Sequence, residues 1–208
     1  LGDGAIVDEY HRAGESIDLK IIAGSAVASL ANLVPVNLVA NALVIGVEAI
    51  SPYMDWENRN VSVLFGDGAA AVVLQASEAE EGLIGETLGC IADARHALRV
   101  RGIGGAYVNT GILQGDTDWD FNGQEIFKRA IAGMGKLSNT VLEKCGVDKD
   151  DVDLVIPHQA NELIIDTLIN RMKIPKEKAV VNIANYGNTS AATIPIAICD
   201  ALEKGLIK

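Results

Sequence analysis

The hydrophobic positions in the first half of the chain fall in runs with little polar alternation. Residues 42–50 (ALVIGVEAI) and 61–75 (VSVLFGDGAAAVVLQ) are rich in Val, Leu and Ile. Such runs are typical of strands that are covered on both faces inside a layered α/β protein. The pattern therefore predicts two strands of a buried sheet, joined by the polar loop SPYMDWENRN at 51–60. Gly66-Asp67-Gly68 is interpreted as a tight turn between two strands.

From Gln124 onward, apolar residues recur at the three- and four-residue spacing of an amphipathic helix. Gly146 is placed to end this helix, Asn161 to begin the next one as its N-cap, and Pro175 follows the end of that second helix. The predicted order is helix, strand, helix, strand, helix, over residues 124–145, 153–157, 162–174, 179–183 and 189–205. Because such alternation is built with parallel strands, the carboxyl ends of the two strands are expected at one edge of the sheet.

Two polar residues lie at that expected edge. His158 follows the first strand in IPHQAN, and Asn188 follows the second in the turn Tyr186-Gly187-Asn188. Together they could offer two N–H donors to one developing oxyanion, as an acyl-transfer site requires. Alternatively, His158 is a core histidine with satisfied hydrogen bonds and Asn188 only caps a helix. The residues themselves leave both interpretations open.

Composition narrows the class of protein. The formal net charge of −11 over 208 residues argues against a general nucleic-acid binder, which needs clustered Lys and Arg. Every apolar run is broken before the roughly 20 residues that a membrane span requires, so no membrane partner is expected. Three widely spaced cysteines and the lack of a secretion signal favour a cytoplasmic location. No spacing of Cys or His suggests a metal site.

Four sequence blocks point to a family. DWENRN with VLFGDGAAAVVL (55–74), GQEIFKRA (123–130), IPHQAN (156–161) and NYGNTSAAT (185–193) resemble β-ketoacyl-acyl-carrier-protein synthase III, in that family's order. The resemblance implies an α/β chain with the layered α/β/α/β/α fold of the thiolases, here mainly its second half plus part of the first. Residues 1–80 would form a partial N-terminal half, and residues 81–208 a C-terminal half without the family's final strand.

The resemblance also implies an activity. Members of the family are acyltransferases that join an acyl-CoA primer to malonyl-acyl-carrier protein with loss of carbon dioxide, which gives a β-ketoacyl thioester and starts fatty-acid synthesis. His158 and Asn188 match the family's pair that hydrogen-bonds the malonyl thioester oxygen. The residues matching the pantetheine and CoA channel are Arg59, Asn60, Gln124, Ala160 and Asn161. Acyl carrier protein and CoA thioesters are the implied partners, in a homodimer that uses no cofactor and no metal.

The chain departs from the family at the nucleophile. Where the family has a cysteine in a turn, this sequence reads Ala23-Gly24-Ser25-Ala26. Ser25 is a possible substitute nucleophile, although a serine hydroxyl needs a base to activate it. Two alternatives therefore stand beside condensation. The chain either only decarboxylates malonyl thioesters or is a catalytically silent thiolase-fold partner subunit.

Overall fold

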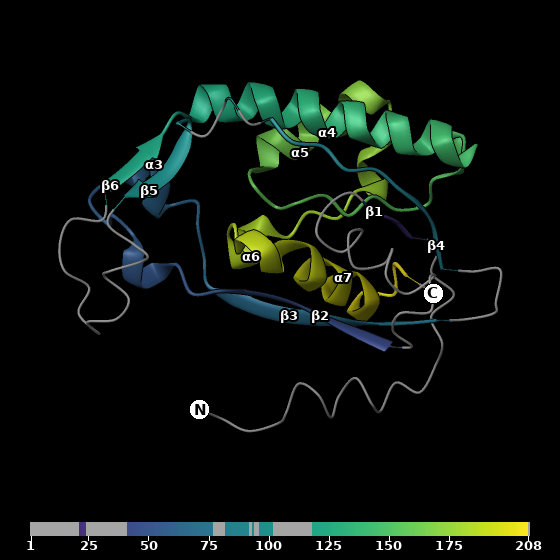
Figure 1. Ribbon diagram of the computed structural model, residues 1–208, viewed down its shortest axis with the longest axis horizontal. Coiled ribbons are helices and arrows are strands. Elements are labelled where there is room, and N and C mark those ends of the chain that lie inside the picture. The colour runs from purple at the N-terminus through teal and green to yellow at the C-terminus, as the bar shows by residue number, and fades with distance from the viewer. Residues whose placement is uncertain are drawn as a thin grey trace.

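The computed structural model describes residues 21–23, 41–76, 82–91, 93, 96–101 and 118–207. Figure 1 shows the helices α4 and α5 in one layer, α6 and α7 in a second layer, and the strand pair β2–β3 on the far side of α7. The bounds of these elements are α4 Gly123–Cys145, α5 Glu162–Met172, α6 Ile183–Tyr186, α7 Thr193–Glu203, β2 Asn41–Glu48 and β3 Gly68–Gln75.

A short parallel pairing lies between the two helical layers. Val155 N donates to Lys178 O at 2.7 Å, and Val180 N donates to Val155 O at 2.9 Å. Val155 packs against a cluster that α5 dominates, whereas Leu154 and Ile156 pack against a cluster centred on α7. Both faces of this pairing are therefore covered. The predicted parallel direction is confirmed, but the predicted strands at 153–157 and 179–183 shrink to one bridge because the chain turns into α6 at Ile183.

Capping residues mark the ends of the long helices. Asn122 Oδ1 accepts a bond from Glu125 N at 3.1 Å at the start of α4, and Gly146 ends that helix in the left-handed region. Asn161 Oδ1 accepts from Leu163 N at 2.8 Å at the start of α5. The predicted helices at 124–145 and 162–174 are thus confirmed, and the third predicted helix becomes α7 after a 3-10 turn at Ser190–Ala192.

The pair β2–β3 is antiparallel, with its register running from Asn41 opposite Gln75 to Glu48 opposite Gly68. The strand predicted over 61–75 is wrong in its first part, because Arg59–Ser62 forms the short helix α3 and β3 begins at Gly68. The prediction that both faces are covered is also wrong among the described residues. One face carries four side chains that are 60–70% exposed: Leu43, Ile45, Val47 and Val73.

Asp67 has a different role from that of a turn between two strands. Its Oδ1 accepts bonds from the backbone N–H groups of Ile50 and Ser51 at 2.7 and 2.8 Å, and its Oδ2 accepts from Ser51 Oγ at 2.5 Å. The segment before β3 is therefore tied to the start of the 3-10 turn at Ser51–Tyr53. The hydrogen bonds from Ser51 hold the pKa of the Asp67 carboxyl below its usual value of 3.8.

Two further strand pairs were not predicted from the sequence. The strands β5 (Leu98–Arg101) and β6 (Asp118–Phe121) are antiparallel, and β1 (Ile21–Ala23) pairs in parallel with β4 (Leu83–Glu86). Trp119 of β6 donates its indole N–H to Tyr53 O at 2.9 Å and packs with Met54 and Val61. This contact fixes the 51–62 segment to β6. Within the described part of the chain, every helix is too short or too polar to cross a membrane.

Candidate active site

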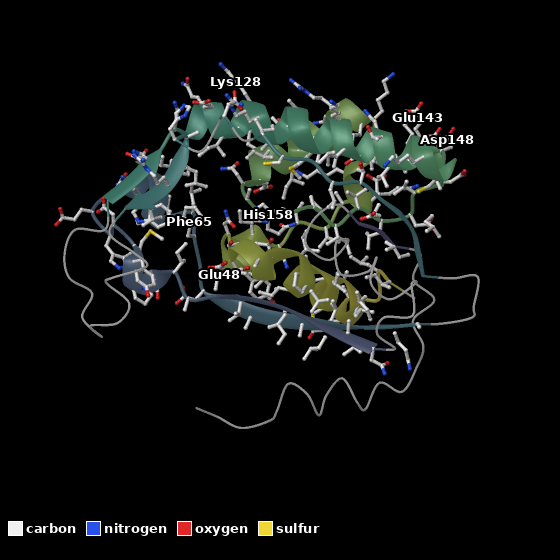
Figure 2. All side chains as sticks on the ribbon, viewed as in Figure 1. Glu48, Phe65, Lys128, Glu143, Asp148 and His158 are labelled. Atoms are coloured by element: carbon white, nitrogen blue, oxygen red, sulfur yellow. The ribbon has the colours of Figure 1, made fainter. Side chains whose placement is uncertain are left out.

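His158 lies just after the central parallel pairing. Figure 2 shows it between the layer of α4 and α5 and the layer of α6 and α7. Its Nδ1 is 2.5 Å from the Oγ1 of Thr193, the first residue of α7. Burial lowers the pKa of the ring below its usual 6.5, so the imidazole is neutral at neutral pH.

Asn188 is fixed by both its backbone and its side chain. Its backbone N donates to Leu64 O at 2.7 Å, and its carbonyl accepts from Gly66 N at 3.1 Å. Its side-chain Oδ1 accepts from Ser190 N at 3.0 Å. Because the protein binds the oxygen of the amide, the Nδ2 group is the end that can donate to a ligand.

One hydrogen-bonded set joins these two residues. Thr193 Oγ1 is 2.9 Å from Ser190 O and 2.5 Å from His158 Nδ1, while Ser190 N binds Asn188. The structure thus brings the two predicted site residues into one network. The alternative interpretation, a satisfied histidine and a local cap, accounts for the His158 Nδ1 and the Asn188 Oδ1 only. For His158 Nε2 and Asn188 Nδ2, the described residues show no hydrogen-bond partner.

Two glycines allow the Asn188 loop to pack against the sheet by its backbone. A Cβ added at Gly46 of β2 would lie 2.3 Å from Ala191 O, and one added at Gly66 would lie 2.2 Å from Tyr186 O. Any side chain at either position would overlap main-chain atoms. The loop that carries Asn188 and Ser190 is therefore held directly against β2 and against the segment that enters β3.

A cavity of about 950 Å³ lies beside α3, the β5–β6 pair and the start of α4. It brings together Asn60 and Gln124, both expected in the ligand channel. The described residues that line it are Asn60, His96, Arg99, Trp119, Asp120, Phe121, Asn122, Gly123 and Gln124. A smaller cavity of about 270 Å³ shares Gly123 and Gln124 with it, and its remaining lining residues are Phe127, Lys128 and Leu163. Gln124 therefore stands where the two cavities meet.

The other expected channel residues line neither cavity. Arg59 is an exposed residue at the start of α3, next to Asn60. Ala160 is partly buried, and Asn161 uses its amide oxygen to cap α5. Ser25 lies outside the described residues. Among the described residues, no group of three or more His, Cys, Asp or Glu side chains could hold a metal ion.

An aromatic contact connects the donor pair to the larger cavity. Phe65 forms a bridge with Asn188, and its ring centroid is 5.1 Å from that of Trp119, which lines the cavity. Trp119 could not be singled out from the sequence, because the four-residue strand that carries it is too short to show a pattern. Sequence reasoning also missed Thr193, whose position near a helix start is common for threonine and carries no signal of its contact with His158.

Comparison with models of known families identifies the family of this chain. Residues 23–91 match the family model of 3-oxoacyl-[acyl-carrier-protein (ACP)] synthase III, and residues 142–208 match the model of its C-terminal part. The chain belongs to the 3-oxoacyl-[acyl-carrier-protein] synthase III family. The resemblance seen in the four sequence blocks is thereby confirmed.

Individual synthases agree with this assignment. The chain is 51% identical to β-ketoacyl-[acyl-carrier-protein] synthase III 2 of Vibrio cholerae over 168 residues. This alignment covers 81% of this chain and 46% of that protein. The solved structure of the synthase III of Thermus thermophilus is 34% identical with a TM-score of 0.78, covering 88% of this chain and 56% of that one. A priming β-ketosynthase of a polyketide biosynthetic pathway is 30% identical with a TM-score of 0.74, covering 88% and 54%.

These similarities confirm the expected α/β class and the thiolase-like fold. The chain spans about half the length of the curated synthase III relatives it matches.

Proposed function

We propose that this chain provides the malonyl-activating side of a synthase III site. The reaction is the decarboxylative condensation of an acyl-CoA primer with malonyl-acyl-carrier protein, which gives a β-ketoacyl thioester and carbon dioxide. The observation that carries the proposal is the network of His158, Thr193, Ser190 and Asn188. This network uses His158 Nδ1 and Asn188 Oδ1, and in the proposal His158 Nε2 and Asn188 Nδ2 are the two groups that bind the thioester oxygen.

The chemistry follows from where charge develops. When the bond between the malonyl carboxylate and its α-carbon breaks, the electron pair moves toward the thioester and its oxygen becomes an enolate. N–H donors at His158 and Asn188 stabilise that oxygen without having to reorganise, because the protein already holds them. The enolate carbon then attacks the primer's acyl thioester, and the primer's thiolate leaves.

The two adjoining cavities support a long thioester arm as ligand. Asn60 and Gln124 line the larger cavity, and their side-chain amides would hydrogen-bond the amides of a pantetheine chain. Lys128 and the exposed Leu163 line the smaller one, and they would meet the partner that delivers this arm. In this proposal that partner is acyl carrier protein, and the larger cavity also admits CoA thioesters.

The proposal extends to the cellular setting of the protein. It includes a homodimer in the cytoplasm, as the resemblance implied. Analytical ultracentrifugation of the purified chain measures its oligomeric state directly. A monomer at micromolar concentration would contradict this part of the proposal and leave the site chemistry untouched.

Decarboxylation without condensation is the second candidate function. The observation that favours it is the set of positions of the three cysteines: Cys145 ends α4, Cys199 lies within α7, and Cys90 is an exposed residue after β4. None of them lies at positions 23–26, which match the family's cysteine motif in the sequence. Intact-mass measurement after incubation with acetyl-CoA separates the two functions. An acyl adduct supports condensation, and its absence together with carbon dioxide release supports decarboxylation alone.

The test of the donor pair is release of labelled carbon dioxide from malonyl-acyl-carrier protein. We expect His158→Ala and Asn188→Ala each to lower the rate by about 10²–10³-fold, the usual cost of removing one oxyanion donor. Asn170→Ala is the matched control, because Asn170 is exposed on α5 and should leave the rate unchanged. Full activity in both donor variants would refute the proposed function.

A further inference from the structure

A tyrosine ties the segment before Asn188 to helix α7. Tyr186, the last residue of α6, donates its hydroxyl hydrogen to Asp200 Oδ1 at 3.1 Å. Asp200 lies within α7 and is 6% exposed, and its Oδ2 accepts from Lys204 Nζ at 2.9 Å. The hydrogen bond from Lys204 keeps the pKa of the Asp200 carboxyl below its usual 3.8, so Tyr186 donates to a carboxylate. Hydrogen bonds to a charged group are stronger than those between neutral groups.

The same helix also contacts His158. Thr193 and Asp200 are seven positions apart, about two helical turns, so they lie on the same side of α7. At the first of these positions, Thr193 Oγ1 is 2.5 Å from His158 Nδ1. At the second, Asp200 binds Tyr186. One helix therefore contacts both the imidazole ring and the segment that leads into Asn188.

The backbone on both sides of Asn188 has conformations that need support. Gly187 has φ 70° and ψ −167°, a region open essentially to glycine alone, and Ser190 has φ 48° although it carries a side chain. Such conformations persist only where the surrounding structure holds them. After Asn188, the Ser190 carbonyl is held by Thr193 Oγ1 at 2.9 Å, at the start of α7. Before Asn188, the Tyr186 hydroxyl provides the link to the same helix.

We propose that Tyr186 and Asp200 position Asn188, by holding the start of its loop on α7 and so fixing its Nδ2 group relative to His158. This inference deepens the proposed function and rests on it for its catalytic consequence. Tyr186 and Asp200 are positioning residues, because they act through Asn188. Their hold on the loop can be measured in the free protein and does not depend on any activity.

Hydrogen exchange of the backbone amides, followed by NMR, tests this hold. The N–H groups of Asn188 and Gly66 form the two hydrogen bonds, of 2.7 and 3.1 Å, that join the loop to the segment before β3. The reference is Val180 N, which bonds at 2.9 Å in the central pairing. We expect Tyr186→Phe to speed exchange at Asn188 and Gly66 about 3–10-fold more than at Val180, the usual effect of losing one hydrogen bond. Asp200→Ala should give the same pattern. Equal acceleration at all three amides, or none, would overturn the proposal.

The matched control for hydrogen exchange is Lys204→Met. It removes the other hydrogen bond of the Asp200 carboxylate and leaves the one from Tyr186 in place. Any loss of stability should then speed exchange at Asn188 and Val180 alike. A selective acceleration at Asn188 in this variant would show that a general loosening of α7, and not the Tyr186 hydroxyl, controls the loop.

A double-mutant cycle on the release of labelled carbon dioxide tests the consequence for catalysis. We expect Tyr186→Phe to lower kcat about 3–10-fold, in line with one hydrogen bond. KM should stay within about twofold, because the described residues that line the two cavities do not include Tyr186. The loss should remain in the His158→Ala background and disappear in the Asn188→Ala background, where the positioned group is gone.

The cycle separates positioning from a general loss of stability. An equal loss of kcat in both backgrounds would overturn the catalytic role of Tyr186, because a merely structural effect does not depend on Asn188. If the wild-type chain releases no carbon dioxide at all, the proposed function fails. Hydrogen exchange then still decides whether Tyr186 and Asp200 hold the loop.

Discussion

Gln159 donates from Nε2 to the backbone carbonyl of Val180 at 3.0 Å, across the central parallel pairing. The same nitrogen donates to Pro157 O at 2.9 Å, and Oε1 accepts from Asn182 N at 3.0 Å. The side chain is 1% exposed. Gln159 therefore binds the segment that carries His158 to the segment that leads into the Asn188 loop.

Replacing this side chain with an apolar one should destabilise the fold. We expect Gln159→Leu to lower the free energy of unfolding by about 2–5 kcal/mol, because each buried polar group left without a partner costs about 1–3 kcal/mol. Urea unfolding followed by circular dichroism measures the loss. Gln75→Leu, at the exposed end of β3, is the control and should stay within about 0.5 kcal/mol of wild type. Equal effects of the two changes would show that the buried bonds of Gln159 contribute little.

The close contact at Gly46 predicts a cost for the smallest side chain. A Cβ there would lie 2.3 Å from Ala191 O and 2.8 Å from Ala191 C, so Gly46→Ala must push the Asn188 loop away from β2. We expect a loss of about 1–3 kcal/mol in unfolding free energy, together with slower decarboxylation.

Gly133 provides the matched comparison for this substitution. A Cβ at Gly133, inside α4, would meet Ile91 Cδ1 at an ordinary 3.6 Å. Gly133→Ala should therefore stabilise the protein by about 0.5–1 kcal/mol, because alanine favours a helix interior. Thermal unfolding of both variants measures the two shifts. If Gly46→Ala costs no stability, the contact at Gly46 is not tight.

The hydrogen bonds to the Asp67 carboxylate lead us to expect a loss of stability in acid. Hydrogen bonds from Ser51 lower the pKa of this carboxyl below 3.8 in the folded chain. A lowered pKa means that its contribution is complete above about pH 4 and is lost as the pH falls through the folded-state value. We expect Asp67→Asn to be less stable than wild type at pH 6, with a difference that narrows below pH 4.

Unfolding in urea at a series of pH values measures the Asp67 effect. The control is Asp153→Asn, which removes the same charge from an exposed position. A difference between Asp67→Asn and wild type that stays constant down to pH 3 would contradict the prediction.

The ring of His158 should titrate in the opposite sense from an ion-paired histidine. Burial lowers its pKa below 6.5, so the unfolded chain takes up the proton first as the pH falls. Its contribution to stability is complete above pH 6.5 and is lost progressively below it. NMR titration measures the pKa directly. In His158→Gln, the stability difference between pH 7.5 and 5.5 should shrink, and a ring that titrates at or above 6.5 would rule this out.

The features that could be predicted from the sequence are those with local causes. The helices α4 and α5 were found because a long apolar period and a capping asparagine act within one element. The helix α3 was missed because its four residues show no period. Val61, 0% exposed, owes its burial to Met54 and Trp119 rather than to a strand.

The residues of the candidate site also fall into those that the sequence could predict and those that it could not. His158 and Asn188 could be singled out because each follows a predicted strand and matches a motif. Their link through Thr193 joins residues 35 positions apart and depends on how α7 packs, which no local pattern records. Of the cavity lining, the sequence indicated Asn60 and Gln124 but not the residues of β5 and β6. These strands have four residues each, and they are recognised by their pairing in the structure.

The hydrogen-bond donors and the larger cavity are built from different elements, and Phe65 connects them. His158 and Asn188 lie on the segments before α5 and α7, whereas much of the cavity wall belongs to β6 and to the start of α4. Under the proposed function, reactivity and ligand choice would therefore be set by separate parts of the fold. Substitutions at Asp120 or Asn122 would then change which ligands the cavity binds. The hydrogen bonds that hold His158 and Asn188 would remain.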